Sequence, residues 1–275
     1  MNITAINTTI EIGLIYSLIA LGVYLSFKII NFSDLTVDGS FTLGAAVAVN
    51  LLLKDVNMPF CLISSFCAGA AAGFVSSILN VKYKIMKILA SILTMSALYS
   101  VNLRIMGERY VSIDKQDDLS LMIFVVIISI AILLILFLKS EIGLSIRITG
   151  QNPEFASSNG VNVGRVTIIT LMLSNGMIAL AGAFFCLLQG FVDITMGAGT
   201  LIIGLASIII GEQLIKIRTI PVIIFIIMLG AILYRFLINF ALNLETASFT
   251  LIPTDLNLLT SSLIVILMVA KKIRG

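Results

Sequence analysis

Long apolar runs recur along this sequence from near its start to near its end, and they constrain the fold more than any other feature. Each run extends over about 17 to 25 residues, the length that an α-helix needs to cross the hydrocarbon core of a bilayer. Only 11% of the residues are charged, against about 25% in a soluble domain. The chain is therefore predicted to be all-α, a polytopic bundle of membrane helices.

The apolar runs predict about nine membrane spans, within a range of eight to ten. No polar block between them is large enough to fold on its own, so we expect one transmembrane domain over residues 1–275. The first run has no basic segment or small-residue cleavage site beside it, and we expect it to be retained as a span. The predicted spans lie near residues 10–30, 36–53, 59–80, 86–103, 119–138, 166–188, 200–215, 219–240 and 257–270.

Lysine and arginine are distributed unevenly over the two sides of this topology. Twelve lie on the side that holds the loop at 139–165 and the final sequence KKIRG, and four lie on the other side. Cytoplasmic loops of membrane proteins collect Lys and Arg, so the richer side is predicted to be the cytoplasm. This orientation places the N-terminus outside and the C-terminus in the cytoplasm.

The residue types that most enzymatic chemistry needs are missing or lie inside apolar runs. Histidine is absent, which removes the commonest general base and metal ligand. The three cysteines, Cys61, Cys67 and Cys186, fall in apolar runs, where a thiol behaves as a small hydrophobe. The sequence has no phosphate-binding loop of the form GxxxxGK[ST]. We therefore expect a transport subunit with no catalytic residue, cofactor, metal site or nucleic-acid partner, and with ATP hydrolysis in another chain.

Small residues at three- and four-residue spacings mark several of the predicted spans. They are concentrated in CAGAAAGFVSS (67–77), GMIALAGAFF (176–185) and GAGTLIIGLAS (197–207). Gly, Ala and Ser at these spacings let helix backbones approach closely in lipid. The pattern predicts a compact bundle with these faces in contact with other helices.

Two segments of the chain share an opening pattern. DLTVDGSFTLGAA begins at Asp34, and DITMGAGTLIIGLA begins at Asp193; both start with Asp, an apolar residue, Thr and an apolar residue. In the predicted topology the two segments enter the membrane from opposite sides. Such a relation is typical of an inverted-topology repeat, in which the substrate path lies between the halves. We expect the halves at about residues 10–138 and 166–270.

Polar groups at these two openings are candidates for the solute path, because ionisable side chains inside a span are costly and mark functional sites by default. Carboxylates in a hydrated vestibule attract a substrate ammonium. Structural roles are the alternative at both openings. At the first, Asp34 would cap a helix and Asp38 and Ser40 would lie in a bend. At the second, Gln189 and Asp193 would belong to an external loop. The candidates are Asp34, Asp38, Ser40, Gln189 and Asp193.

The segment KSEIGLSIRITGQNPEFASSNGVNVGRV, residues 139–166, breaks the apolar pattern between the fifth and sixth predicted spans. Asn152 is placed to cap a helix that begins at Pro153, and Glu154 in its first turn suits the helix dipole. The helix is expected to run for about two turns and to end before Gly160. A short helix of this kind at the membrane surface is suited to docking, and a simple surface loop is the alternative.

The sequence GLSIRITGQNPEFASSNGVNVGR resembles the cytoplasmic coupling loop of bacterial ABC-importer permeases of the branched-chain amino acid and ribose type. DLTVDGSFTLGAA and LAGAFFCLLQGFVDITMGAGTLIIGLASIIIGE are similar, more narrowly, to the permeases of lipoprotein-dependent tryptophan or tyrosine uptake. The likeness extends over residues 10–270. It implies a multi-pass permease of the bacterial cytoplasmic (inner) membrane that imports a small solute, an amino acid and more narrowly an aromatic one, by alternating access driven by a separate ATPase.

The resemblance also implies partners and contact residues. Two permease copies, expected to be a homodimer in membrane lipid, work with two ABC ATPase subunits and an extracytoplasmic substrate-binding (lipo)protein. The coupling helix sits in a groove of the ATPase, with Phe155 as its apolar plug. An alternative function is an ion-coupled secondary transporter in which Asp34, Asp38 and Asp193 carry protons or Na⁺. The residues assigned to the ATPase contact are Asn152, Pro153, Glu154, Phe155 and Ala156.

Overall fold

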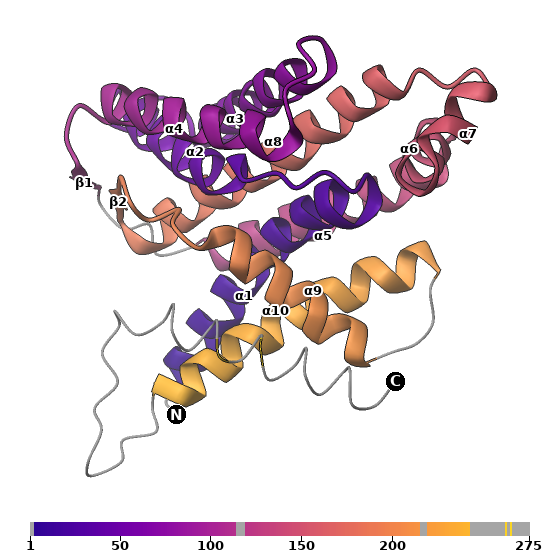
Figure 1. Ribbon diagram of the computed structural model, residues 1–275. Coiled ribbons are helices and arrows are strands. Elements are labelled where there is room, and N and C mark those ends of the chain that lie inside the picture. Colours follow the sequence, from indigo (N-terminus) through magenta and orange to yellow (C-terminus); the bar gives the residue numbers. More distant parts are fainter. Residues whose placement is uncertain (1–2, 114–118, 215–218, 243–261, 263–264, 266–275) are drawn as a thin grey trace.

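The computed structural model describes residues 3–113, 119–214 and 219–242, together with Ser262 and Val265, and these are helical apart from two short strands and the connections (Figure 1). The first elements are α1 (Ile3–Val23) with its π-helical continuation η1 (Tyr24–Ile29), α2 (Thr36–Leu52), α3 (Met58–Val81), α4 (Lys87–Met106) and β1 (Tyr110–Ser112). The later elements are α5 (Ser120–Lys139), α6 (Glu141–Gln151), α7 (Pro153–Ser158), α8 (Val163–Gln189), β2 (Phe191–Asp193), α9 (Thr200–Leu214) and α10 (Ile220–Leu242).

The described chain holds two classes of apolar helix. Six are long and apolar enough to cross a membrane, namely α1 with η1, α3, α4, α5, α8 and α10. α2 and α9 are apolar too, but they are shorter, with 17 and 15 residues. The spans predicted at 36–53 and 200–215 are thus present as two apolar helices shorter than the other six. The predicted span at 257–270 lies outside the described residues, Ser262 and Val265 excepted.

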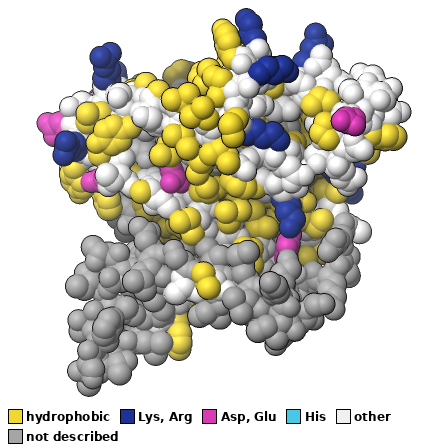
Figure 2. Space-filling view, in the orientation of Figure 1, with side chains coloured by type: hydrophobic (Ala, Val, Ile, Leu, Met, Phe, Trp, Pro, Cys, Tyr) yellow, Lys and Arg dark blue, Asp and Glu magenta, His cyan; other side chains and the backbone are white. Residues whose placement is uncertain are grey.

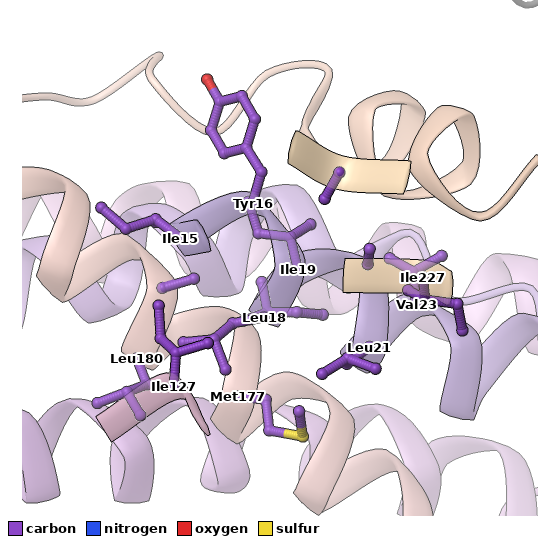
Figure 3. Packing of buried hydrophobic residues seen from close by; sticks show 14 of the residues in the cluster. Ile15, Tyr16, Leu18, Ile19, Leu21, Val23, Ile127, Met177, Leu180 and Ile227 are labelled. Atoms are coloured by element: carbon purple, nitrogen blue, oxygen red, sulfur yellow. The ribbon is translucent and has the colours of Figure 1, made fainter. Parts of the chain in front are cut away.

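The helices pack in two groups that meet at α1 and α8. α8 lies against α2 and α3, and α2 also packs on α4, whereas α1 lies against α9 and α10 (Figure 1). α1 and α8 contact each other and are the most buried spans, with 72% and 83% of their apolar windows inside the bundle. Figure 3 shows side chains of α1, such as Leu18, near Ile127 of α5 and Leu180 of α8. The hydrophobic core therefore lies around these two helices.

Glycines allow the close helix contacts that the small-residue pattern predicted. A Cβ added at Gly182 of α8 would lie 1.9 Å from the carbonyl oxygen of Phe41 in α2. One added at Gly69 of α3 would lie 2.4 Å from the carbonyl oxygen of Asn175 in α8. No side chain fits at these distances, so the packing faces expected in residues 67–77 and 176–185 are confirmed.

The surface of the described residues is largely apolar. Figure 2 shows hydrophobic side chains spread over one face, with few charged groups among them. Leu121 of α5 is 75% exposed and Phe60 of α3 is 59% exposed. Large apolar side chains exposed over several helices are suited to contact with lipid.

Each end of the bundle is held by its own contacts. At one end, Asn31 donates from Nδ2 to the carbonyl oxygen of Gly150 in α6 (2.8 Å), and Lys28 forms an ion pair with Glu212 (2.8 Å). At the other end, β1 and β2 pair in an antiparallel ladder with Tyr110 opposite Asp193. The strands, η1 and α6 were not expected from the sequence.

Candidate functional site

A buried network of three polar side chains joins the start of α2 to the middle of α8. Asp34, in the connection before α2, is fully buried. Its Oδ1 accepts a hydrogen bond from the backbone N–H of Thr36 (2.9 Å), and its Oδ2 accepts one from Nδ2 of Asn175 (2.7 Å). The Oδ1 of Asn175 in turn accepts from the hydroxyl of Ser40 (2.7 Å). Buried polar groups are stable when they are paired in this way, so the network fixes α2 against α8.

These contacts bear on the structural alternatives for the first opening. Asp34 accepts from the backbone N–H of Thr36, two residues later, and so forms a turn at the start of α2, whose N-cap residue is Leu35. The alternative with a bend at Asp38 and Ser40 does not hold, because residues 36–52 form one continuous helix. Asn175 was missed, although a lone amide inside an apolar run is a visible signal in the sequence.

Asp38 links α2 to the start of α9. This half-buried carboxylate accepts from the backbone N–H of Gly199 through Oδ2 (3.1 Å) and from that of Leu201 through Oδ1 (2.9 Å). The first N–H groups of a helix have no partner within the helix and carry partial positive charge, so a carboxylate stabilises them. Gly197 permits the contact, because a Cβ there would lie 2.0 Å from the carbonyl oxygen of Asp38.

The two contacts lie in the interior of the bundle. Asn175 is near the middle of the 27-residue helix α8, and Asp38 lies one helical turn beyond Asp34. The starts of two short helices therefore meet at Asp38 inside the bundle. In transporters, ends of interrupted helices near the bilayer midplane form substrate sites.

A cavity of about 230 Å³ opens beside Asp38, between α2, α4 and the segment from β2 to α9. It brings residues from three distant parts of the chain together. The side chains and backbone that line it belong to Asp38, Gly39, Thr42, Met95, Ser96, Tyr99, Asn102, Ile194, Thr195 and Ala198. Of the predicted path residues, Asp38 alone is in this lining.

Gln189 and Asp193 lie at the end of the bundle that carries the strands. Gln189 is the last residue of α8, and Gly190 after it turns the chain with a φ of 78°. Asp193 ends β2, and its Oδ1 accepts from the backbone N–H of Thr195 (2.7 Å). This bond spans two residues, as does the bond between Asp34 and Thr36, so the two echoed segments share a turn.

The short helix predicted after Asn152 is present as α7. The Oδ1 of Asn152 accepts from the backbone N–H of Phe155 (3.0 Å), and the helix ends at Ser158. Phe155 is 57% exposed, whereas Ala156 is fully buried. α6 precedes α7 where a loop was expected, so the segment is a pair of short helices with one exposed aromatic side chain.

Comparison with known sequences identifies the family. Residues 6–270 match the family described as branched-chain amino acid transport system / permease component. The chain belongs to this permease family. The permease is 39% identical over 260 residues to the tyrosine transport system permease protein of Clostridioides difficile (strain R20291), covering 92% of this chain and 86% of that relative. It is also 35% identical over 217 residues to an uncharacterized protein of Rickettsia prowazekii (strain Madrid E), covering 75% and 76%.

A solved structure shows the same fold. PsaBC from Streptococcus pneumoniae in complex with Fab matches the permease with a TM-score of 0.58 over 96% of this chain and 89% of the other, at 14% identity. The permease is thus the membrane component of an ABC importer and not its ATPase. Membership of the family also implies ATPase and binding-protein partners.

Proposed function

We propose that this permease imports an amino acid, with an aromatic one such as tyrosine as the expected solute, by alternating access coupled to a separate ATPase. The observation that carries the proposal is the meeting of α2 and α9 at Asp38, next to the cavity of about 230 Å³. The family and the relative named for tyrosine transport support the solute class. The other path candidates then support or flank the path and do not line this cavity; they are Asp34, Ser40, Gln189 and Asp193.

Alternating access requires two units that move against each other, and we infer inverted halves at about residues 10–138 and 166–270. Asp34 and Asp193 are 159 residues apart, and a shift of this size brings α1, α2 and α3 close to α8, α9 and α10 in order. Each half also begins with a helix that packs among later helices of the other half, α1 with α9 and α10, and α8 with α2 and α3. This exchange supports a repeat whose halves are interlocked.

The coupling contact is proposed at α7, between residues 139 and 165. Its exposed Phe155 is suited to an apolar pocket of the ATPase, and Asn152, Pro153 and Glu154 are exposed beside it. The buried Ala156 would support the helix from inside. We further propose a homodimer with α7 and the C-terminus on the cytoplasmic side of the bacterial inner membrane and the N-terminus outside, as the cation distribution favours.

Uptake of labelled L-tyrosine tests the function. Proteoliposomes with the permease, its ATPase and its binding lipoprotein should accumulate tyrosine when ATP is present. Ionophores that collapse ion gradients should leave this accumulation unchanged. Asp38→Asn should reduce uptake about tenfold or more in an assembled complex, because it removes the charge that faces the cavity. Uptake that survives without the ATPase and collapses with the ion gradient would instead support the secondary transporter. Unchanged uptake in Asp38→Asn would exclude Asp38 from the path.

A substitution on α7 tests the coupling contact. Phe155→Asp places a charge where an apolar plug is proposed, so the ATPase should no longer copurify with the permease. Ser158→Asp is the matched control, because it adds the same charge to an exposed position of the same helix. A Phe155→Asp complex that assembles and hydrolyses ATP as the parent does would contradict the assignment.

A further inference from the structure

The cavity beside Asp38 has a largely apolar wall that includes one carboxylate and a few uncharged polar groups. We propose that it is an ammonium-binding subsite of the solute path, in which Asn102 supplies the second acceptor next to Asp38. The proposal rests on the import function above and specifies its solute chemistry. It takes primary amines with a small apolar or aromatic body, amino acids included.

Asn102 carries an acceptor that the fold leaves unused. This residue of α4 is 1% exposed, and its Nδ2 donates to the carbonyl oxygen of Gly39 (3.1 Å). Its Oδ1 is buried and has no hydrogen-bond partner within the described part of the chain. A buried carbonyl oxygen without a donor is unfavourable, and Asn102 lines the cavity. The free Oδ1 therefore marks a position that a donor would stabilise.

Asp38 has acceptor capacity left after it binds α9. A carboxylate offers about four lone-pair positions, and backbone N–H groups occupy two of them. The negative charge has no cation beside it in the cavity, because none of the described residues that line it is Lys or Arg. Asp38 can thus accept from a ligand without leaving the start of α9.

The two threonines of the lining also present acceptors. The hydroxyl of Thr42 donates to the carbonyl oxygen of Asp38 (3.3 Å), and that of Thr195 donates to the carboxylate of Asp193. Since each hydroxyl proton is engaged, only oxygen lone pairs remain for the cavity. Ser96 and Tyr99 also line the cavity, and their hydroxyls can donate or accept, so the fixed feature of the lining is the single negative charge of Asp38.

The charge of Asp38, with no Lys or Arg among the described residues of the cavity lining, favours one chemical class of ligand. An ammonium group carries three donors and no acceptor, whereas a carboxylate carries acceptors alone and is repelled by Asp38. Met95 and the ring of Tyr99 supply less polar walls, and an aromatic face attracts a cation. The volume of about 230 Å³ is below the roughly 300–1,000 Å³ of pockets for drug-sized ligands, which suits the amine end of a small solute.

Binding to the purified permease–ATPase complex in nanodiscs, without the binding protein, tests the subsite directly. The probes are tyramine, L-tyrosine and 3-(4-hydroxyphenyl)propionate, followed by saturation-transfer NMR. Tyramine and tyrosine should bind, and the propionate, which lacks the amine, should bind at least about tenfold more weakly.

Substitutions at Asn102 test its role. Asn102→Leu should weaken tyramine binding about tenfold or more, because one hydrogen bond to a charged group is lost. Asn102→Asp keeps the acceptor and should bind tyramine at least as tightly as the parent.

Asn50 provides the matched control. Its Nδ2 donates from α2 to the carbonyl oxygen of Ile105 in α4 (2.6 Å), so it joins the same two helices as Asn102. It is not in the cavity lining, and Asn50→Leu should leave tyramine binding unchanged. Equal losses in Asn50→Leu and Asn102→Leu, or equal binding of tyramine and the propionate, would overturn the subsite.

Uptake separates this proposal from the import function. One result is a complex that binds tyramine in a way that depends on Asn102 and yet fails to import L-tyrosine. That result would support the ammonium subsite and reject tyrosine as the imported solute. The opposite result is a complex that imports tyrosine but binds tyramine equally well with and without Asn102. That result would support the import function and reject the subsite.

Discussion

The start of α2 and the segment before α9 have related sequences and unequal surroundings. In both, an aspartate accepts from the backbone N–H of a threonine two residues later, Asp34 from Thr36 and Asp193 from Thr195. Asp34 is fully buried, whereas Asp193 is half-buried. The shared residues therefore repeat a local turn, and the environment decides how much each turn contributes to stability.

The residue four positions later differs, and the difference is complementary. The first segment has Asp38 there, and the second has Gly197. The carboxylate of Asp38 reaches the start of α9, and Gly197 leaves room for the backbone of Asp38. The first segment supplies the carboxylate of Asp38, and the second supplies the space at Gly197. The contact between α2 and α9 therefore depends on the two segments having different residues at this position.

The largest effect is expected at Gly197. Gly197→Leu would place a Cβ 2.0 Å from the carbonyl oxygen of Asp38 and 2.5 Å from Oγ1 of Thr42, so α2 and α9 cannot stay together. We expect little or no monodisperse protein on size-exclusion chromatography. Gly39→Ala is the milder comparison, because its Cβ would lie 3.0 Å from Cδ1 and 3.2 Å from Cβ of Leu98, with the nearest backbone atom, Cα of Met95, at 3.5 Å. A normal yield of Gly197→Leu would disprove the complementary contact.

An intermediate effect is expected at Asn175. Asn175→Leu leaves the buried carboxylate of Asp34 without its side-chain donor and should destabilise the protein by about 2–4 kcal/mol. Adding Asp34→Leu should recover part of this loss, because no buried charge remains. Thermal unfolding followed by a thiol dye that reports on the buried Cys61 and Cys186 measures both. A double variant less stable than Asn175→Leu would contradict the role given to the charge.

The smallest effect is expected at the second turn. Asp193→Ala removes a partly solvated hydrogen bond of the turn, and we expect a loss of about 1 kcal/mol or less in the same unfolding assay. Thr195 stays in place, so the change isolates the carboxylate. If this variant loses as much stability as Asn175→Leu, the difference in burial does not explain how much each turn contributes to stability.

Features that depend on neighbours in the sequence were predicted well. The six long apolar helices follow from hydrophobic runs, and the start of α7 follows from Asn152 and Pro153, since both signals act within a few residues. α6 was missed because its short, mixed sequence resembles a polar loop. The strands were missed because each has three residues and needs the other as partner.

The candidate site was predicted in part, for the same reason. Asp38 was selected because a charge in an apolar run is visible in the sequence. Its partner, the start of α9, lies more than 160 residues away, and no local pattern connects the two. Asn102 and the lining around Tyr99 come from α4, whose register against α2 only the packed structure gives.

The packing of α1 has a consequence for biosynthesis. α1 leaves the ribosome before the other helices that the structure describes, yet its neighbours α9 and α10 come more than 170 residues later in the sequence. At about 5–20 residues per second, roughly ten seconds or more pass before they are made. During that time the newly inserted helix has its eventual contact face open to lipid or to the insertion machinery. The order of synthesis is thus not the order of assembly, and the final bundle closes only after most of the polypeptide is in the membrane.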